Sequence, residues 1–451
     1  MRYLPHTLED VDAMLEAIGV DSIDDLFEQI PEEFRLDRRL ELPEPKSELT
    51  LERHLGELAS KNAVAGGDVV SFLGAGLYDH HSPHALQQLL LRAEYYTSYT
   101  PYQPEISQGT TKSIFEFQSM VAELLGVPIA NASMYDGAHA TAEAALMAQR
   151  VGRKRDKVYV AESVHPEYRQ VIQTYLSPQD DTYREIPVDW ETGQLSLEKV
   201  QEAIEDPKDA ACIIFQTPNF FGVIEDPTAV VEWAHEHKIK VVASFNEPLA
   251  FALTTPPGHY GADIVAGEGT SLGIPMGYGG PALGIFGCRE KLVRKMPGRL
   301  AGYTVDTEGR EGYVLTLSTR EQHIRREKAT SNICTNQGLM ALAAGIYMSL
   351  MGKEGIREMA QLNLSRAHYA MDVLESTGQA KRVFSGPFFN EFVVETRAPA
   401  KAVVAEAAED GILPGFDLGR ANPKWQNYLL VAVTEKTSRR DIDRLANYLS
   451  P

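Results

Sequence analysis

The chain has 451 residues, a formal net charge of −20, and 43% hydrophobic and 24% charged residues. This length predicts a large core with an appended domain, and the composition is that of an ordinary globular protein. The acidic balance argues against nucleic acid as a partner, and no apolar run reaches the ~20 residues of a membrane span. Without the apolar core of a signal peptide, and with three widely spaced cysteines, the sequence predicts a cytoplasmic protein with reduced thiols.

Residues 1–64 are expected to form an N-terminal helical arm. Thr7 and Asp10 have the spacing of a capping box at the start of a helix. The two prolines of segment 42–45 predict an extended linker. Such an arm buries little surface by itself, so we expect it to wrap around another part of the chain or a second subunit.

Residues 65–325 alternate short apolar runs with amphipathic helices and are expected to form a large α/β domain. In these runs apolar residues follow one another without alternating polar residues, which is typical of parallel strands buried on both faces. They comprise residues 158–160, 211–215, 241–243, 264–266 and 283–286. The repeated order of strand, helix and strand predicts a doubly wound, mostly parallel sheet.

Residues 326–451 have a different pattern and are expected to form a smaller C-terminal α+β domain. Apolar residues from Leu339 to Leu350 lie on one helical face, and Gly352 is expected to end that helix before a second one over 354–375. Further elements are predicted as strands at 392–394 and 428–433 and helices near 401–409 and 438–449.

The segment 131–140 precedes a helix of small residues. Free backbone N–H groups at a helix start bind anions, and small residues let a phosphate approach closely. We interpret this segment as a phosphate cradle or, alternatively, as a tight loop that packs the helix on the sheet. Its candidate site residues are Ser133, Asp136, Gly137 and His139.

Other polar residues follow predicted strands. The ring of His165 could stack on a cofactor or serve as a structural hydrogen-bonding group. Glu247 could pair with a pyridinium nitrogen or cap the next turn. The cluster of His80, His81 and His84 does not have a spacing that suits one metal ion, so no metal site is expected.

A segment rich in tyrosine and proline extends from residue 95 to residue 109. Its composition interrupts regular structure and predicts either a surface loop or a rigid loop that faces a small polar ligand or a partner. The residues expected to make such contacts are Tyr95, Tyr96, Tyr99, Tyr102 and Gln103. A basic run at 320–328 is either a solvated helix with Glu–Lys pairs or a contact with an acidic partner or a subunit.

Together these segments resemble the glycine cleavage system P-protein family over the whole chain, from the N-terminal arm to the C-terminal domain. The most specific stretches are residues 99–109, 131–137, 257–265 and 320–335. The last stretch is long and irregular enough to make chance agreement negligible. The resemblance implies a type I pyridoxal-phosphate-dependent transferase fold.

In this family two homologous halves occur as one long chain or as separate α and β subunits, and 451 residues correspond to one half. The half that carries pyridoxal phosphate has a lysine in a segment ending in Pro-x-Gly-x-Gly-Gly-Pro. Alignment on Pro275 and Pro281 puts Thr270 at the lysine position, and threonine cannot form a Schiff base. Two further departures are His139 in place of a threonine and Glu247 in place of an aspartate. The resemblance therefore implies the α subunit (subunit 1), with the cofactor bound by a β subunit in an α2β2 complex.

The reaction implied for the complex is decarboxylation of glycine on pyridoxal phosphate, with release of CO2 and transfer of the aminomethyl group to the lipoyl arm of H-protein. We expect the tyrosine segment to face the site of the β subunit. The cradle residues, His165 and Glu247 are expected to be remnants of an ancestral site or packing residues. One alternative is a scaffold subunit that only stabilises β and docks H-protein. Another is an independent enzyme that uses Lys291 or Lys295.

Overall fold

The computed structural model describes residues 5–36, 38–67, 69–152, 154–179, 181–378 and 380–449. It divides into two compact units, residues 1–63 and residues 64–451. The residues on both sides of the predicted boundary at 325/326 belong to the second unit, so the division into three domains stays a prediction.

The first unit contains two α-helices, α1 (Leu8–Ile18) and α2 (Glu48–Ala59), without a buried residue on either. The predicted capping box is confirmed: Thr7 N–H donates to Asp10 Oδ2 at 2.7 Å, and Asp10 N–H donates to Thr7 Oγ1 at 3.2 Å. Gly19 ends α1 with a φ of 87°, a left-handed conformation that suits glycine. Two short 3₁₀ turns, Asp24–Phe27 and Glu32–Phe34, follow α1.

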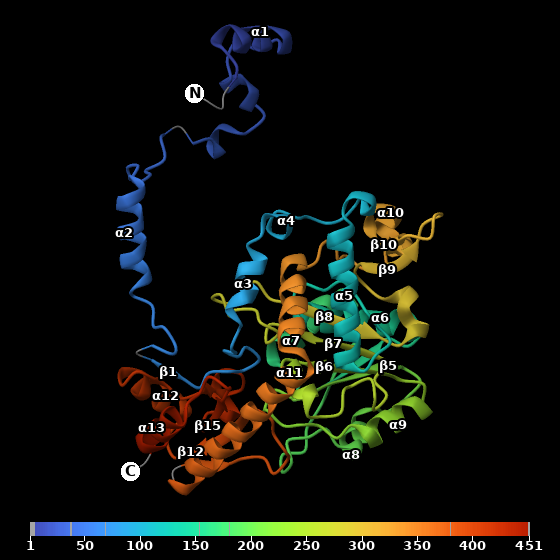
Figure 1. Cartoon of the computed structure of the whole chain (residues 1–451), viewed down its shortest axis with the longest axis vertical. Coiled ribbons are helices and arrows are strands. Elements are labelled where there is room, and N and C mark those ends of the chain that lie inside the picture. The colour runs from blue at the N-terminus through green and yellow to red at the C-terminus, as the bar shows by residue number, and fades with distance from the viewer. Residues whose placement is uncertain are drawn as a thin grey trace. The chain divides into compact units, whose positions relative to one another are not determined.

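The second unit is built around a seven-stranded sheet with the order β2-β8-β7-β6-β5-β3-β4 (Figure 1). Strands β4, β3, β5, β6 and β7 are parallel to one another, whereas β8 is antiparallel to both β7 and β2. The strands are β2 (Ile129–Ala130), β3 (Lys157–Ala161), β4 (Tyr183–Ile186), β5 (Ala210–Gln216), β6 (Lys240–Phe245), β7 (Ile264–Glu268) and β8 (Gly284–Cys288). All five predicted runs are strands, and the mostly parallel sheet is confirmed.

Helices pack on this sheet and supply most of the large hydrophobic core. Helix α6 contacts β5, β6, β7 and β8, and its small buried residues allow this close approach. The helices of this region are α3 (His84–Leu90), α4 (Ala93–Tyr96), α5 (Gln108–Leu125), α6 (Gly137–Gly152), α7 (Pro166–Leu176), α8 (Leu197–Ala203), α9 (Thr228–Glu236) and α10 (Gln322–Arg325). A hairpin of β9 (Leu300–Val305) and β10 (Glu311–Thr316) lies against α5. Short 3₁₀ turns occur at Pro104–Ile106, Pro248–Ala252, Glu290–Lys295, Ser318–Arg320 and Arg326–Lys328.

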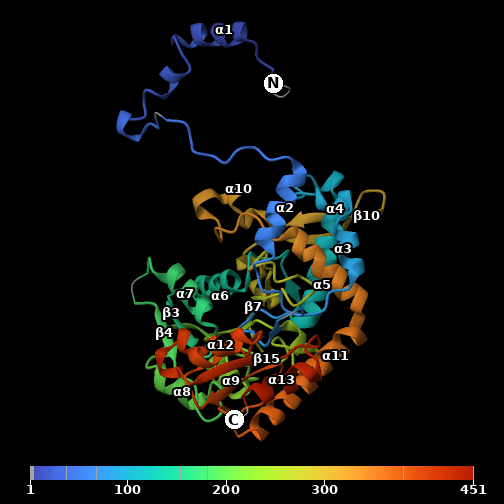
Figure 2. The same ribbon diagram turned by 90° about the vertical axis from the view of Figure 1, so that its left-hand side faces the viewer.

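The C-terminal part has a second, antiparallel sheet with the order β11-β12-β15-β14. Its strands are β11 (Ala380–Arg382), β12 (Glu391–Thr396), β15 (Tyr428–Ala432) and β14 (Phe416–Asp417). Helices α12 (Ala400–Glu409) and α13 (Arg439–Leu449) lie beside it (Figure 2), and residues of both share a hydrophobic cluster with β12 and β15. A short parallel pair, β1 (Val70–Ser71) and β13 (Ile412–Leu413), and 3₁₀ turns at Leu418–Arg420 and Pro423–Trp425 complete this part.

Helix α11 (Gly338–Ser376) connects the two sheets. It lies against α5 and then reaches β11 and α13 (Figure 1). Gly352 interrupts it with φ 59° and ψ −178°, at the position predicted for the end of a helix. The glycine therefore produces a kink between two helical segments. Residues from Ala341 to Met348 join the large hydrophobic core, and residues from Ala367 to Leu374 join the cluster of the C-terminal sheet.

Candidate functional site

A cleft of about 400 Å³ lies at the carboxyl ends of the central parallel strands, where ligands bind in open α/β folds. It is bounded by the start of α6, the residues after β3, β6 and β7, and the glycine-rich loop after Thr270. Among the predicted site residues, Asp136, His139, His165 and Thr270 line this cleft.

The start of α6 is closed by the carboxyl group of Glu268. Its Oε2 accepts the Gly137 N–H at 3.0 Å, while Oε1 accepts the Thr270 hydroxyl and the N–H groups of Gly269, Thr270 and Leu283. Burial raises the pKa of Glu268, and these hydrogen bonds oppose that effect. An acidic side chain of the protein thus accepts the first N–H group of this helix, which would otherwise be available to a phosphate.

A second carboxylate lies beside it. Asp136 Oδ1 accepts the His139 N–H at 2.8 Å, and Asp136 Oδ2 lies 2.7 Å from His139 Nδ1. The predicted cradle is therefore a helix start at which two side chains of the chain itself accept the N–H groups of Gly137 and His139.

Two further polar side chains of the cleft, His165 and Asn246, form hydrogen bonds with neighbouring residues. His165 Nε2 lies 2.8 Å from the Ala75 carbonyl oxygen and Nδ1 accepts the Glu167 N–H, so the ring is an N-terminal cap of α7. Burial lowers the pKa of His165, which favours the neutral ring. Asn246 donates from Nδ2 to the Tyr168 hydroxyl at 3.0 Å, and its buried Oδ1 has no hydrogen-bond partner among the described residues.

Two predicted residues lie outside this cleft. Glu247 is buried and contacts His80 and Ser271 instead. The hydroxyl oxygen of Ser133 accepts the Gln337 N–H at 3.2 Å and Asn336 Nδ2 at 3.0 Å, so it fixes the start of α11. Ser133 has a φ of 120°, and the Asn131 side chain accepts its N–H. Both residues therefore connect elements of the fold.

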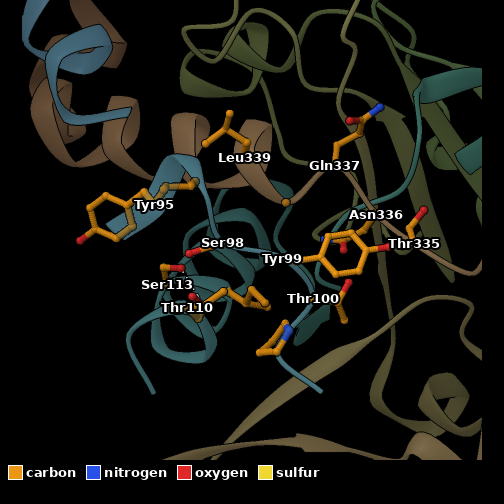
Figure 3. A pocket seen from close by; sticks show the side chains of 14 residues that line it. Tyr95, Ser98, Tyr99, Thr100, Thr110, Ser113, Thr335, Asn336, Gln337 and Leu339 are labelled. Carbon is orange, nitrogen blue, oxygen red and sulfur yellow. Dashed lines mark hydrogen bonds between the residues drawn. The ribbon is translucent and has the colours of Figure 1, made fainter. Parts of the chain in front are cut away.

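The tyrosine segment forms one wall of a separate cavity of about 280 Å³ (Figure 3). Tyr95 and Tyr99 line it together with Ser113 of α5 and the start of α11 at Asn336 and Gln337. Tyr99 is 73% exposed, so most of its side chain is open to solvent in this chain. The backbone is fixed on one side by Gln108, which donates to the carbonyl oxygens of Pro104 and Tyr313.

The other residues of the segment that were expected to make contacts, Tyr96, Tyr102 and Gln103, do not line the cavity. Tyr102 stacks with the buried guanidinium of Arg299, whose Cζ is 5.4 Å from the ring centroid. Tyr96 and Gln103 are exposed. Lys291 and Lys295, considered as alternative cofactor lysines, lie in the 3₁₀ turn after β8, and neither lines the cleft.

No group of histidine, cysteine, aspartate and glutamate in the described ranges has the arrangement of a metal site. The described helices also include none with the length and hydropathy of a membrane span.

Solved structures of distant relatives define the class of fold. The chain resembles a sphingosine-1-phosphate lyase of Burkholderia pseudomallei (TM-score 0.65, 16% identity, 94% of this chain and 93% of the other) and a glutamate decarboxylase of Lactobacillus brevis (TM-score 0.68, 12% identity, 94% and 96%). These likenesses, together with the mixed central sheet, show a type I pyridoxal-phosphate-dependent fold, as predicted.

The model of the family "Glycine cleavage system P-protein" matches residues 1–449, so the chain belongs to this family. It is 50% identical to the "Probable glycine dehydrogenase (decarboxylating) subunit 1" of Geobacillus thermodenitrificans, over 99% of this chain and 98% of that protein. The protein of the same name from Moorella thermoacetica is 48% identical, with the same coverage. A crystal structure of an inhibitor-bound glycine decarboxylase (P-protein) of the glycine cleavage system superimposes with a TM-score of 0.88, at 40% identity over 100% of this chain and 99% of the other.

The residues of the cleft do not fit pyridoxal phosphate. Neither lysine nor arginine is among the described residues that line it. A phosphate at the start of α6 would meet the carboxyl groups of Asp136 and Glu268, and the N–H of Gly137 is already bonded. Asn246, which lines the cleft where the sequence analysis expected an acid, cannot pair as a carboxylate with a pyridinium nitrogen.

Sequence reasoning missed Glu268 and Asn246. Glu268 ends a buried strand between two glycines, and an acid in that position has to find donors within the fold. This pattern could have marked it as an internal anion. Asn246 precedes Glu247 directly, and period-two alternation after β6 could have indicated that only one of the two faces the cleft.

Proposed function

We propose that this chain is the α subunit (subunit 1) of a glycine dehydrogenase (decarboxylating), and that a β subunit binds pyridoxal phosphate. The observation that carries the proposal is the contact between Thr270 and Glu268 at the position where the family resemblance implies the lysine. A chain with this contact has no amine there, and the N–H groups of Gly137 and His139 at the helix start already have acceptors. By family resemblance, the complex is an α2β2 assembly that decarboxylates glycine and passes the aminomethyl group to lipoylated H-protein.

The role proposed for this chain is to complete the partner's site with its tyrosine segment. Tyr99 supports this proposal because it is 73% exposed at a cavity whose other walls are fixed by α5 and α11. An exposed aromatic ring on a fixed backbone can bind a partner at a low entropic cost. Tyr95 is on the same cavity, while Tyr96, Tyr102 and Gln103 extend the exposed surface around it.

Absorbance of the purified chain with pyridoxal phosphate tests where the cofactor binds. The chain alone is expected to give no borohydride-reducible Schiff-base band, and a mixture with the β subunit is expected to give both the band and glycine decarboxylation. The Thr270→Lys variant alone is also expected to give no band, because Glu268 would pair with the new amine. A reducible band from the unmodified chain would contradict the proposal.

Variants of the tyrosine segment separate a catalytic contribution from a scaffold role. Tyr99→Ala is expected to reduce glycine decarboxylation by the assembled complex, whereas Tyr303→Ala, at an exposed position on β9, is the matched control. Size-exclusion chromatography would establish that both variants still assemble. Full activity of an assembled Tyr99→Ala complex would favour a subunit that only stabilises β and docks H-protein.

A further inference from the structure

A second cavity, of about 340 Å³, is lined almost entirely by cations and hydroxyl groups. We name it the basic cavity, and its lining residues are Arg294, Lys295, Leu317, Thr319, Arg320, Arg325, Lys328 and Thr330. No aspartate or glutamate is among them. In a chain with a net charge of −20, five cationic side chains around one small cavity form an exceptional positive region.

These five cations form no ion pair with a carboxylate in the described ranges. Glu321 is adjacent in sequence, but its Oε2 lies 3.5 Å from Arg299 Nε and 3.8 Å from His323 Nδ1. Lys291, on the same 3₁₀ turn as Arg294 and Lys295, does have a partner, because its Nζ lies 3.9 Å from Asp263 Oδ1. The five cations of the cavity thus differ from Lys291, their neighbour on this turn, in having no carboxylate partner within the described ranges.

Arg320 is 8% exposed, and its guanidinium is fixed by three carbonyl oxygens, those of Met296, Gly298 and Leu317. A guanidinium has five N–H groups, so two N–H groups remain after these bonds. A buried cation without an ion-pair partner is costly. Burial lowers the pKa of Arg320, and the charge of nearby Glu321 only partly opposes this effect. An anion bound in the cavity would offset this cost.

We propose that the basic cavity binds a small ligand that carries a phosphate group. A dianionic phosphate has oxygen acceptors for several donors at once, and arginine binds such groups through paired N–H donors. Arg325 is held by a bond from Nε to the Thr319 carbonyl oxygen, which leaves its terminal nitrogens available. The hydroxyl groups of Thr319 and Thr330 add neutral donors, and Leu317 adds apolar surface for an organic part of the ligand.

The small volume and the depth of Arg320 favour this ligand over an acidic segment of another protein. A carboxylate on a folded surface would reach the exposed side chains of Arg325 and Lys328 but would leave the buried guanidinium unpaired. A phosphate that enters the cavity can contact both kinds of cation. The ligand is thus a free phosphate ion or a phosphate monoester, which share the same recognised group.

Calorimetric titration of the full chain tests this proposal, with inorganic phosphate and glycerol phosphate as probes at constant ionic strength. Constant ionic strength separates specific binding from screening. Saturable binding is expected, and the double variant Lys295→Ala, Arg325→Ala is expected to weaken it by roughly tenfold or more because two charged donors are lost. Lys291→Ala is the matched control and should bind as the unmodified chain does.

The comparison of the two probes identifies the source of the phosphate. Tighter binding of glycerol phosphate would assign a monoester, and equal binding would assign the free ion. Thermal unfolding would establish that the double variant is folded to the same extent as Lys291→Ala. Three results would each overturn the proposal: no binding of either probe, equal binding by a folded double variant, or binding of an acidic peptide but of neither phosphate.

Discussion

The Nε2 atom of His80 lies 2.7 Å from Oε2 of Glu247, and these side chains are 3% and 1% exposed. The other ring nitrogen, Nδ1, lies 2.8 Å from Oε2 of Glu435. The histidine thus joins the segment before α3, the end of β6 and the segment after β15. Burial works against a charged imidazole, but the two carboxylates outweigh it and raise the pKa of His80 to about 10.

This shift predicts a loss of stability at alkaline pH. The pKa of His80 is higher in the folded chain (about 10) than its ordinary value of 6.5, so the protonated ring stabilises the fold fully below pH 6.5. That contribution is lost as the pH rises from 6.5 through about 10. Chemical denaturation over this pH range would give the free energy of unfolding of the unmodified chain and of His80→Ala. The two free energies should converge as the pH rises.

Removal of the His80 side chain is expected to lower the free energy of unfolding by about 3 kcal/mol near pH 7, because two carboxylates would lose their shared cation. His81→Ala is the matched control. The His81 side chain is exposed, and only its backbone N–H bonds to Glu435, so this variant should retain the network. Equal stabilities of the two variants would show that the network contributes nothing.

Glu391 is expected to make the stability of the fold depend on pH in a lower pH range than His80 does. Its Oε1 accepts the Ala75 N–H at 2.6 Å and its Oε2 accepts the Tyr78 hydroxyl at 2.9 Å, while burial raises its pKa to about 7. A raised acid pKa stabilises the fold at low pH, and this contribution is lost as the pH rises from about 4.5 to 7. Glu391→Gln should therefore gain stability relative to the unmodified chain, on the order of 2 kcal/mol between pH 5 and pH 8.

The control for this effect is Glu395→Gln. Glu395 is exposed on the same strand, β12, so its replacement should not alter the pH profile. Urea unfolding at both pH values measures the difference. A Glu391→Gln profile parallel to that of the unmodified chain would argue against a buried group that titrates near neutrality.

Glu268→Ala is expected to destabilise the fold by about 2 kcal/mol or more, because the donors of Gly137, Thr270 and Leu283 would lose their acceptor in a buried position. Glu167→Ala is a suitable comparison, since Glu167 lines the same cleft but is exposed. Denaturant midpoints of the two variants that agree within error would mean that the helix start does not depend on the internal carboxyl group.

Two glycine substitutions should have opposite signs. At Gly137, an added Cβ would lie 1.8 Å from the Tyr168 hydroxyl oxygen, so Gly137→Ala should cost about 3 kcal/mol or prevent folding. At Gly109 in α5, an added Cβ has no neighbour within 4 Å, so Gly109→Ala should stabilise the helix by about 0.5 kcal/mol. Thermal unfolding measures both, and a stable Gly137→Ala variant would exclude the close packing of α6 on Tyr168.

Local signals in the sequence were sufficient for much of the fold. The continuous apolar runs predicted the central strands, and Gly352 marked the interruption of α11. The direction of β8 was not predictable in this way, because a buried strand has the same composition whether it is parallel or antiparallel.

The site was harder to predict because its partners are remote in sequence. His80 and Glu435 are 355 positions apart, and Gly137 and Glu268 are 131 apart. The spacing of the histidine cluster argued against a metal site. The same spacing could not identify the acids that bind His80. Similarly, the missing lysine was visible at Thr270, whereas the carboxyl group that bonds to Thr270 required the fold.

The carboxyl group of Glu268 takes the place that a dissociable anion could have at the start of α6, and this affects how the stability of the fold depends on solutes. A dissociable ligand stabilises a folded protein to an extent that depends on its free concentration. The acceptor at the start of α6 is covalently part of the chain. Its local concentration therefore stays constant when the protein is diluted or when free anions are removed from the solution. The bond between Gly137 and Glu268 therefore forms as soon as the chain folds, and it does not depend on the concentration of a solute anion.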